Sequence, residues 1–70
     1  MTIKAEFLPG TEIEAAFAEA SRVAGILGVQ IEFPFNDVTC FARPGGDAKR
    51  GAEHYRREFN SDSKYKTAFN

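Results

Sequence analysis

Hydrophobic and polar positions recur with two different periods along the chain, and the change of period separates strands from helices. Residues 2–7 alternate apolar and polar side chains, the pattern of a strand with one buried face. Between Thr11 and Gly28 the apolar residues recur at spacings of three and four, as on an amphipathic helix; they are Ile13, Ala16, Phe17, Ala20, Ala24 and Leu27. Thr11 and Glu14 have the spacing of a capping box, and Gly28 stands where a helix ends in the left-handed conformation.

The next alternating segment predicts a β-hairpin. Residues 29–35 and 38–43 have the pattern of strands, and Asn36 and Asp37 between them tolerate the positive φ of a two-residue loop. With this loop every inward cross-strand pair is apolar; the pairs are Phe35 with Val38, Phe33 with Cys40, and Ile31 with Ala42. Because a slip of one residue would mix the two faces, we expect this register.

Pro34 provides an argument about strand order. In the predicted register Pro34 lies opposite Thr39 at a non-hydrogen-bonded site, so its missing N–H points away from residues 38–43. Proline within a sheet is largely confined to edge strands. We therefore expect residues 29–35 to form an edge strand, with residues 2–7 on the far side of residues 38–43 and parallel to residues 29–35.

A second helix and an alternating tail complete the pattern. Asp47 is a good N-cap, and the apolar residues after it share one helical face; they are Ala48, Ala52, Tyr55 and Phe59. Gly51 within this helix either frays its start or lets it approach the sheet closely. Alternation over residues 64–69 predicts a fourth strand beside residues 2–7, with a flexible tail over residues 60–70 as the alternative. One side of this strand carries Tyr65, Thr67 and Phe69.

These elements define one α+β domain over residues 1–70. Its β-α-β-β-α core spans residues 2–59, and we expect both helices on one face of the sheet. With the fourth strand, the element order and a strand order of 4-1-3-2 resemble the ferredoxin-like fold in outline. That resemblance implies a fold and no particular function.

The composition is that of a folded chain without covalent or metal support. Hydrophobic residues make up 43% of the sequence and include seven Phe and two Tyr, enough for a packed interior. The single cysteine, Cys40, cannot form an internal disulfide, and no cluster of Cys and His has the spacing of zinc ligands. No apolar run or signal segment targets a membrane. We expect a cytoplasmic protein without a cofactor and, since so small a core often relies on association, a homodimer.

Charge is divided unevenly along the chain, although the formal net charge is only −1. Residues 1–40 carry two basic and six acidic side chains, a net of −4, whereas residues 41–70 carry seven basic and four acidic ones, a net of +3. Four of the basic residues, Lys49, Arg50, Arg56 and Arg57, form a predicted basic ridge on the second helix. Such a ridge steers an acidic partner or a nucleic acid, or is simply solvated.

No set of catalytic residues emerges. His54 is the only histidine and is expected on the surface of the second helix, while Cys40 is assigned to the core face of its strand. Gly45 and Gly46 lead into a helix N-terminus that can hold a phosphate, but Asp47 there repels an anion and the spacing is not that of a phosphate loop. We predict a protein that is not an enzyme and binds no metal.

The sheet face turned away from the helices is the most informative surface. Its expected members are Lys4, Glu6, Gln30, Glu32, Thr39, Phe41 and Arg43, with Lys64 and Lys66 as further candidates. Phe41 among basic groups is similar to the stacking platform of RNA-recognition sheets, but those sheets use aromatics on two adjacent strands, and residues 2–7 offer only Lys4 and Glu6 there. The alternatives are an anchor for a protein partner, or a Phe covered by neighbouring side-chain stems.

The compact core between Thr11 and Arg43, the missing active-site motif and the short chain resemble the accessory proteins of bacteriophages and mobile elements, among them anti-CRISPR proteins. This resemblance implies stoichiometric binding to a host protein complex, without turnover. We therefore predict a non-enzymatic protein-binding module, an inhibitor of a host defence complex, that uses Phe41, Arg43, Lys49, Arg50, Arg56 and Arg57. The alternative is a small nucleic-acid-binding or nucleotide-binding protein that uses the basic second half.

Overall fold

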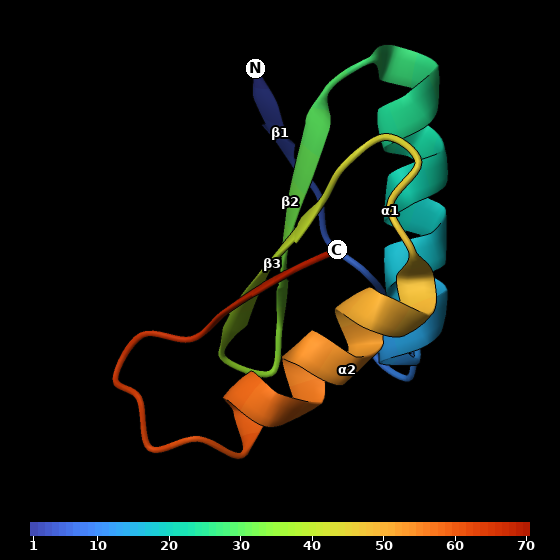
Figure 1. Ribbon diagram of the computed structural model, residues 1–70. Coiled ribbons are helices and arrows are strands. Elements are labelled where there is room, and N and C mark those ends of the chain that lie inside the picture. Colours follow the sequence, from blue (N-terminus) through green and yellow to red (C-terminus); the bar gives the residue numbers. More distant parts are fainter.

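Four strands and two helices alternate along the chain in the order β-α-β-β-α-β (Figure 1). A computed structural model describes residues 1–70. The strands are β1 (Thr2–Lys4), β2 (Gln30–Phe35), β3 (Val38–Ala42) and β4 (Thr67–Phe69), and the helices are α1 (Ile13–Leu27) and α2 (Ala48–Phe59). The predicted α+β class and element order are confirmed, and the tail forms a fourth strand that is shorter than the alternation over residues 64–69 indicates.

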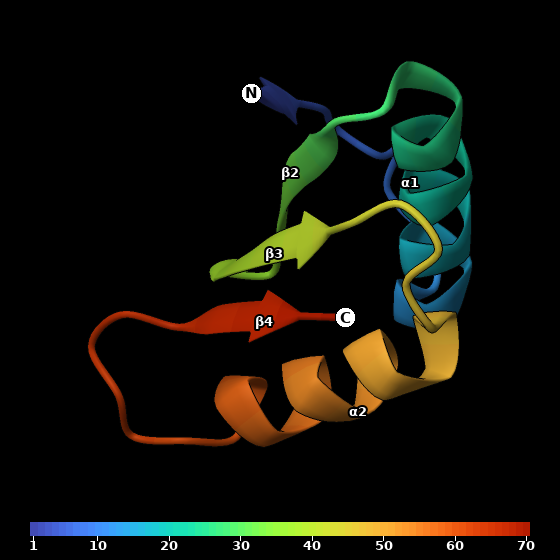
Figure 2. The same ribbon diagram turned by 45° about the horizontal axis from the view of Figure 1, so that its top comes forward.

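The sheet consists of two parallel pairs joined by a hairpin. Its strand order is β1-β2-β3-β4, with β1 parallel to β2, β2 antiparallel to β3, and β3 parallel to β4. Each parallel pair is connected by a helix, so the chain is built from two β-α-β units. Both helices pack on the same face of the sheet, and the opposite face is left open (Figure 2).

The hairpin between β2 and β3 has the predicted register. Phe35 pairs with Val38, Phe33 with Cys40 and Ile31 with Ala42, and all six side chains except Phe35 are buried. The loop residues Asn36 and Asp37 have φ of 46° and 68°. Two positive φ angles give a turn whose twist matches the twist of the strands, which is why two residues suffice.

The predicted strand order 4-1-3-2 is wrong, because β1 lies beside β2 and β4 lies beside β3. The proline argument is locally correct: Pro34 faces Thr39, and its missing N–H points to the β1 side. However, β1 ends before it reaches Pro34. The amide of Ala5 still donates to the carbonyl of Glu32, at 2.8 Å, and the next donor that β2 would offer is the absent N–H of Pro34. Proline thus limits the length of β1 rather than excluding it.

The start of α1 differs from the capping-box prediction. The Thr11 hydroxyl donates to the carbonyl of Leu8 at 2.8 Å, within the turn that contains Gly10, so it is not available to the helix. The helix begins at Ile13 after Glu12, without a side-chain cap, and ends as expected at Gly28 with φ of 68°. Five of the six predicted inward residues are buried, but Leu27 is 52% exposed.

Helix α2 begins at its predicted cap and crosses α1 closely. The carboxylate of Asp47 accepts hydrogen bonds from the amides of Lys49 and Arg50. Gly51 allows the close approach, but toward α1 and not toward the sheet: a Cβ atom there would lie 2.7 Å from the ring of Phe17. Tyr55 is buried as predicted, while Phe59 at the end of the helix is 46% exposed.

The core lies between the sheet and the two helices. Phe17 and Phe33 are fully buried and meet edge to face with ring centroids 5.1 Å apart, and Phe7 meets Phe33 in the same way at 5.0 Å. Strand β4 contributes only Ala68 to this core. The predicted inward face of residues 2–7 holds for Ala5 and Phe7, whereas Ile3 on the edge strand is 37% exposed.

Candidate functional site: an aromatic and arginine hollow

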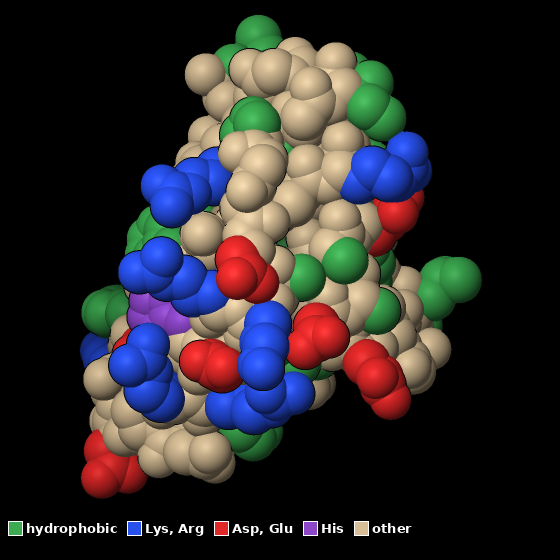
Figure 3. All heavy atoms as spheres, turned by 45° about the vertical axis from the view of Figure 1, so that its right-hand side comes forward, with side chains coloured by type: hydrophobic (Ala, Val, Ile, Leu, Met, Phe, Trp, Pro, Cys, Tyr) green, Lys and Arg blue, Asp and Glu red, His purple; other side chains and the backbone are tan.

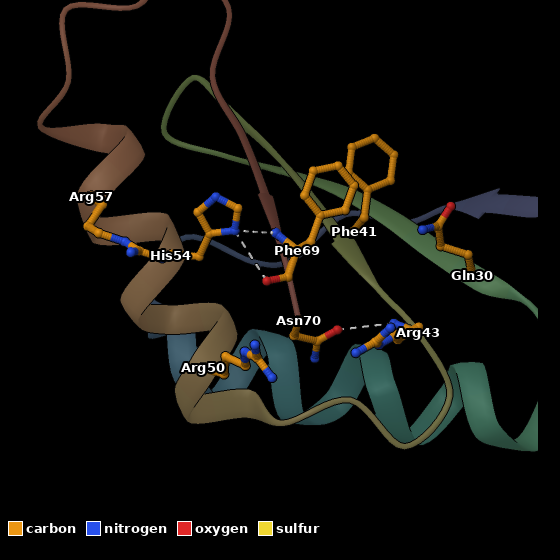
Figure 4. Close-up of a pocket in the computed structure, with 8 residues that line it drawn as sticks. All are labelled: Gln30, Phe41, Arg43, Arg50, His54, Arg57, Phe69 and Asn70. Atoms are coloured by element: carbon orange, nitrogen blue, oxygen red, sulfur yellow. Dashed lines mark hydrogen bonds between the residues drawn. The ribbon is translucent and has the colours of Figure 1, made fainter.

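Two phenylalanines stand side by side on the open face of the sheet. Phe41 of β3 and Phe69 of β4 are paired in register, and because Ala68 points to the core, Phe69 points to the open face. Their rings are stacked, with centroids 5.0 Å apart and an interplanar angle of 12° (Figure 4). Phe69 is 49% exposed. The pair therefore offers aromatic surface on two adjacent strands.

His54 of α2 closes the outer edge of β4. The amide N–H of Phe69 faces away from β3 and donates to Nδ1 of His54 at 3.0 Å. An edge strand otherwise leaves this donor to solvent. Since a backbone N–H can only donate, Nδ1 is the acceptor and the ring proton is on Nε2. The imidazole also lies 6.0 Å from the Phe69 ring, so it continues the row of rings.

Asn70 fixes the position of β4 from the inside. Its side-chain oxygen accepts from the amide of Arg43 at 3.1 Å, and its Nδ2 donates to the hydroxyl of Ser21 at 2.7 Å. The side chain fits against Gly46, where any Cβ atom would overlap it. Asn70 is 6% exposed, so these hydrogen bonds are shielded from water. The two side chains Asn70 and His54 hold β4 on opposite sides of the strand.

Three arginines line the same hollow as the aromatic pair. Arg43 follows β3, and Arg50 and Arg57 lie on α2 with His54, at spacings of four and three residues that put them on one side of the helix. The only ion pair in the molecule joins Arg22 and Glu19 on α1, so none of these three guanidinium groups is paired with a carboxylate. Figure 3 shows basic side chains on either side of the single histidine.

These residues line one shallow hollow of about 360 Å³ (Figure 4). We call it the aromatic–arginine hollow; its lining consists of Gln30, Phe41, Arg43, Arg50, His54, Arg57, Phe69 and Asn70. Gln30 lies on the side of Phe41 away from Phe69, and its side-chain oxygen accepts from the hydroxyl of Thr2 at 3.1 Å. The hollow joins the open sheet face to one side of α2.

The structure divides the six predicted site residues into two groups. Phe41, Arg43, Arg50 and Arg57 meet in the hollow, but Lys49 and Arg56 do not. Successive residues of a helix are about 100° apart, so the residue before each of the two lining arginines is turned away from β4. The predicted basic ridge is therefore two separate lines of side chains on α2, and only one of them faces the aromatic pair.

Lys66, a further candidate for the open face, does not lie there. Its ammonium group donates to the carbonyl of Phe59 at 3.0 Å and lies 5.7 Å from that ring's centroid, on the α2 side of β4. The side of the tail that does face outward carries Thr67 and Phe69. Phe69, His54 and Asn70 are the lining residues that sequence reasoning missed; the alternation of residues 64–69 grouped Phe69 correctly, but placing it beside Phe41 requires the strand order.

Other candidate chemistry is absent from the hollow. The start of α2 is occupied by the Asp47 carboxylate, which already binds two of its free amides. Cys40 is buried in the core, and burial raises the pKa of its thiol to about 12, so it remains protonated at neutral pH. No group of three or more His, Cys, Asp or Glu side chains is arranged to hold a metal ion.

Comparisons with known proteins give no match: no family model, no curated protein and no solved structure is significantly similar to this chain. Neither α1 nor α2 combines the length and the apolar sequence that a membrane-spanning helix requires.

Proposed function

We propose that this protein binds single-stranded nucleic acid in the aromatic–arginine hollow. The observation that carries the proposal is the stacked pair of Phe41 and Phe69 on adjacent strands, next to three arginines without carboxylate partners. The sequence pattern predicted only one aromatic side chain on the open face, and the structure adds a second one on a neighbouring strand. The proposal is for binding without turnover, in keeping with the prediction that the protein is not an enzyme.

Stacking and charge have separate roles in this proposal. Every nucleobase has a flat face, and stacking on an aromatic side chain contributes about 1–3 kcal/mol per base. The half-exposed ring of Phe69 and the part of the Phe41 ring that lines the hollow are available for this contact. The guanidinium groups of Arg43, Arg50 and Arg57 bind phosphates, and each neutralised phosphate of a single strand releases counterions. Binding therefore weakens as salt concentration rises.

The test is fluorescence anisotropy of a labelled oligothymidylate over a series of salt concentrations. We expect binding at low salt, with a slope of log affinity against log salt of about −0.7 per phosphate contact, thus about −2 for three arginines. The double variant Arg50→Glu with Arg57→Glu weakens binding at least tenfold. Its matched control is Lys49→Glu with Arg56→Glu, which changes the charge of the same helix equally but not in the hollow.

Two outcomes would contradict the proposal. The first is no binding of any single strand by the wild type at low salt. The second is an equal loss of affinity in both double variants, because this would assign the binding to the overall charge of α2 and not to the hollow. Phe69→Ala separates stacking from charge, since it should weaken binding while leaving the salt slope unchanged.

A second candidate function is the binding of a protein, as the resemblance to phage accessory proteins implies. It is favoured by the half-exposed ring of Phe69 beside Phe41, since aromatic residues with an arginine rim are common at the centres of protein interfaces. A host defence complex and a second copy of this chain are the partners expected from the sequence. For the self-associated form, light scattering should give a dimer mass for the wild type and a monomer mass for Phe69→Ser.

A further inference from the structure

The polar side chains of the aromatic–arginine hollow differ from those of the rest of the open face in their hydrogen-bonding character. Arg43, Arg50 and Arg57 can only donate. Gln30 has its oxygen engaged by Thr2, so its Nε2 amino group is the part left free for a ligand. The side chains that approach a bound molecule here are therefore donors.

His54 and Asn70 do not alter this character. Nδ1 of His54 accepts the amide of Phe69, which leaves the Nε2–H as the free group of the ring. Asn70 has its oxygen and its nitrogen engaged by Arg43 and Ser21, and it is almost completely buried. Hence the free polar groups of the lining side chains are mainly donors, and the second lone pair of the Gln30 oxygen is the acceptor that remains.

The acceptors of the open face lie in a neighbouring hollow. Glu32 is paired with Phe41 across the β2–β3 ladder, but it lines a separate depression together with Lys4, Glu6, Pro34 and Thr39. Gln30 of β2 and Arg43 after β3 line the hollow together with Phe41, so the edge of a base stacked on Phe41 within the hollow is placed against them.

The geometry points to a preference for guanine at this position of the bound strand, an inference that rests on the proposed function. Guanine presents two adjacent acceptors, O6 and N7, on one edge, and arginine is their most common protein partner. Adenine presents one acceptor and one amino donor on the same edge, and cytosine presents an amino donor. Where the lining side chains are mainly donors, those amino groups lose hydrogen bonds to water and find fewer protein acceptors in return.

The experiment compares oligothymidylates that carry one central guanine, adenine, inosine or 7-deazaguanine. We expect the guanine and inosine strands to bind about tenfold more tightly than the adenine strand, since both keep O6 and N7. The 7-deazaguanine strand, which stacks equally well but lacks N7, should lose most of this advantage. Anisotropy at constant salt measures all four affinities.

Gln30→Glu tests the assignment, because it replaces the free donor by an acceptor that can still bind the Thr2 hydroxyl. The expected result is loss of the preference for guanine over adenine, measured as the ratio of the two affinities so that the added charge cancels. The matched control is Glu32→Gln on the same strand and face, which should keep the preference.

The outcomes separate this inference from the proposed function. Equal binding of the guanine and adenine strands by the wild type overturns the inference and leaves nucleic-acid binding in place. Loss of the preference in Glu32→Gln but not in Gln30→Glu assigns base recognition to Glu32 and also overturns it. Failure of every strand to bind contradicts the proposed function itself.

Discussion

At the scale of single residues, the same amino acid has opposite roles in the two helices. Gly25 in α1 has open space where a Cβ atom would lie, whereas a Cβ atom on Gly51 in α2 would lie 2.7 Å from the Phe17 ring. Phe17 is fully buried and packed edge to face on Phe33, so it has no room to move aside. The effect of a substitution at Gly25 is therefore set by helix propensity, and the effect of a substitution at Gly51 is set by packing.

We expect Gly25→Ala to raise the free energy of unfolding by about 0.5–1 kcal/mol, because alanine restricts the unfolded chain and favours a helix. Gly51→Ala should lower it by about 1–3 kcal/mol, because overpacking between the helices exceeds the gain in propensity. Urea denaturation of the two variants and the wild type measures both changes. An equal stabilisation by both substitutions would mean that α1 and α2 are not in close contact.

Cys40 makes stability depend on alkaline pH. Burial raises the pKa of its thiol from an ordinary value of 9.0 to about 12, so between these values the folded protein keeps a proton that the unfolded chain releases. The free energy of unfolding therefore falls as pH rises from about 9 to about 12. In Cys40→Ala this contribution is missing, and its stability should decline less steeply over the same range. Parallel stability curves for the two proteins above pH 9 would contradict the burial of the thiol.

At the scale of elements, the hairpin could be predicted from the sequence and the strand order could not. The register of β2 and β3 follows from local alternation and a two-residue loop, since a slip of one residue would turn apolar side chains such as Phe33 and Cys40 to the open face. Whether β1 can lie beside β2 depends on where β1 ends, because Pro34 excludes only a neighbouring strand that continues past Pro34. The alternating tail can pair equally well with the strand at either edge of the sheet.

Because the strand order could not be predicted, most of the site could not be predicted either. Phe41 and the arginines were predicted as candidates from exposure and charge, but a platform on two strands requires the neighbour of β3 to be known. The roles of His54 and Asn70 are hydrogen bonds between segments 15 and 27 residues apart, and no periodicity encodes such contacts. The sequence pattern predicts which face of its strand or helix a residue occupies, but it does not predict which residues of other elements lie beside it.

Strand β4 is the element that depends most on individual side chains. We expect Asn70→Ala to lower the free energy of unfolding by about 1–3 kcal/mol, since it leaves the amide of Arg43 and the hydroxyl of Ser21 unpaired. Hydrogen exchange should become faster at the amide of Thr39, which donates to Lys66, and stay slow within the β2–β3 hairpin. The control is Asn60→Ala, which removes an exposed hydrogen bond to Arg56. Unchanged exchange at Thr39 would mean that Asn70 does not hold the strand.

At the scale of the whole molecule, the two β-α-β units carry net charges of opposite sign. The first half of the chain has a net charge of −4 and the second half +3, and the molecule measures 34 by 23 by 20 Å. At 0.1 M salt the Debye length is about 10 Å, shorter than each of these dimensions. The acidic side of α1 therefore affects a ligand in the hollow only at low ionic strength.

We expect Glu12→Gln with Glu14→Gln to raise the affinity for oligothymidylate by less than about threefold at low salt and to have no effect at 0.15 M salt, where the Debye length is about 8 Å. Anisotropy titrations at the two salt concentrations measure this. A large effect that persists at the higher salt would place the bound strand against α1 and not in the hollow.

The small share of β4 in the core has a consequence for how affinities are interpreted. Only Ala68 would lose its burial in the core if β4 detached, so local opening of this strand requires far less free energy than unfolding of the domain. The site is complete only in the closed state, because Phe69 belongs to β4. The apparent dissociation constant is then the intrinsic one divided by the closed fraction. A substitution at Ser21, which holds Asn70 but does not line the hollow, can weaken binding in this way without altering any contact with the ligand.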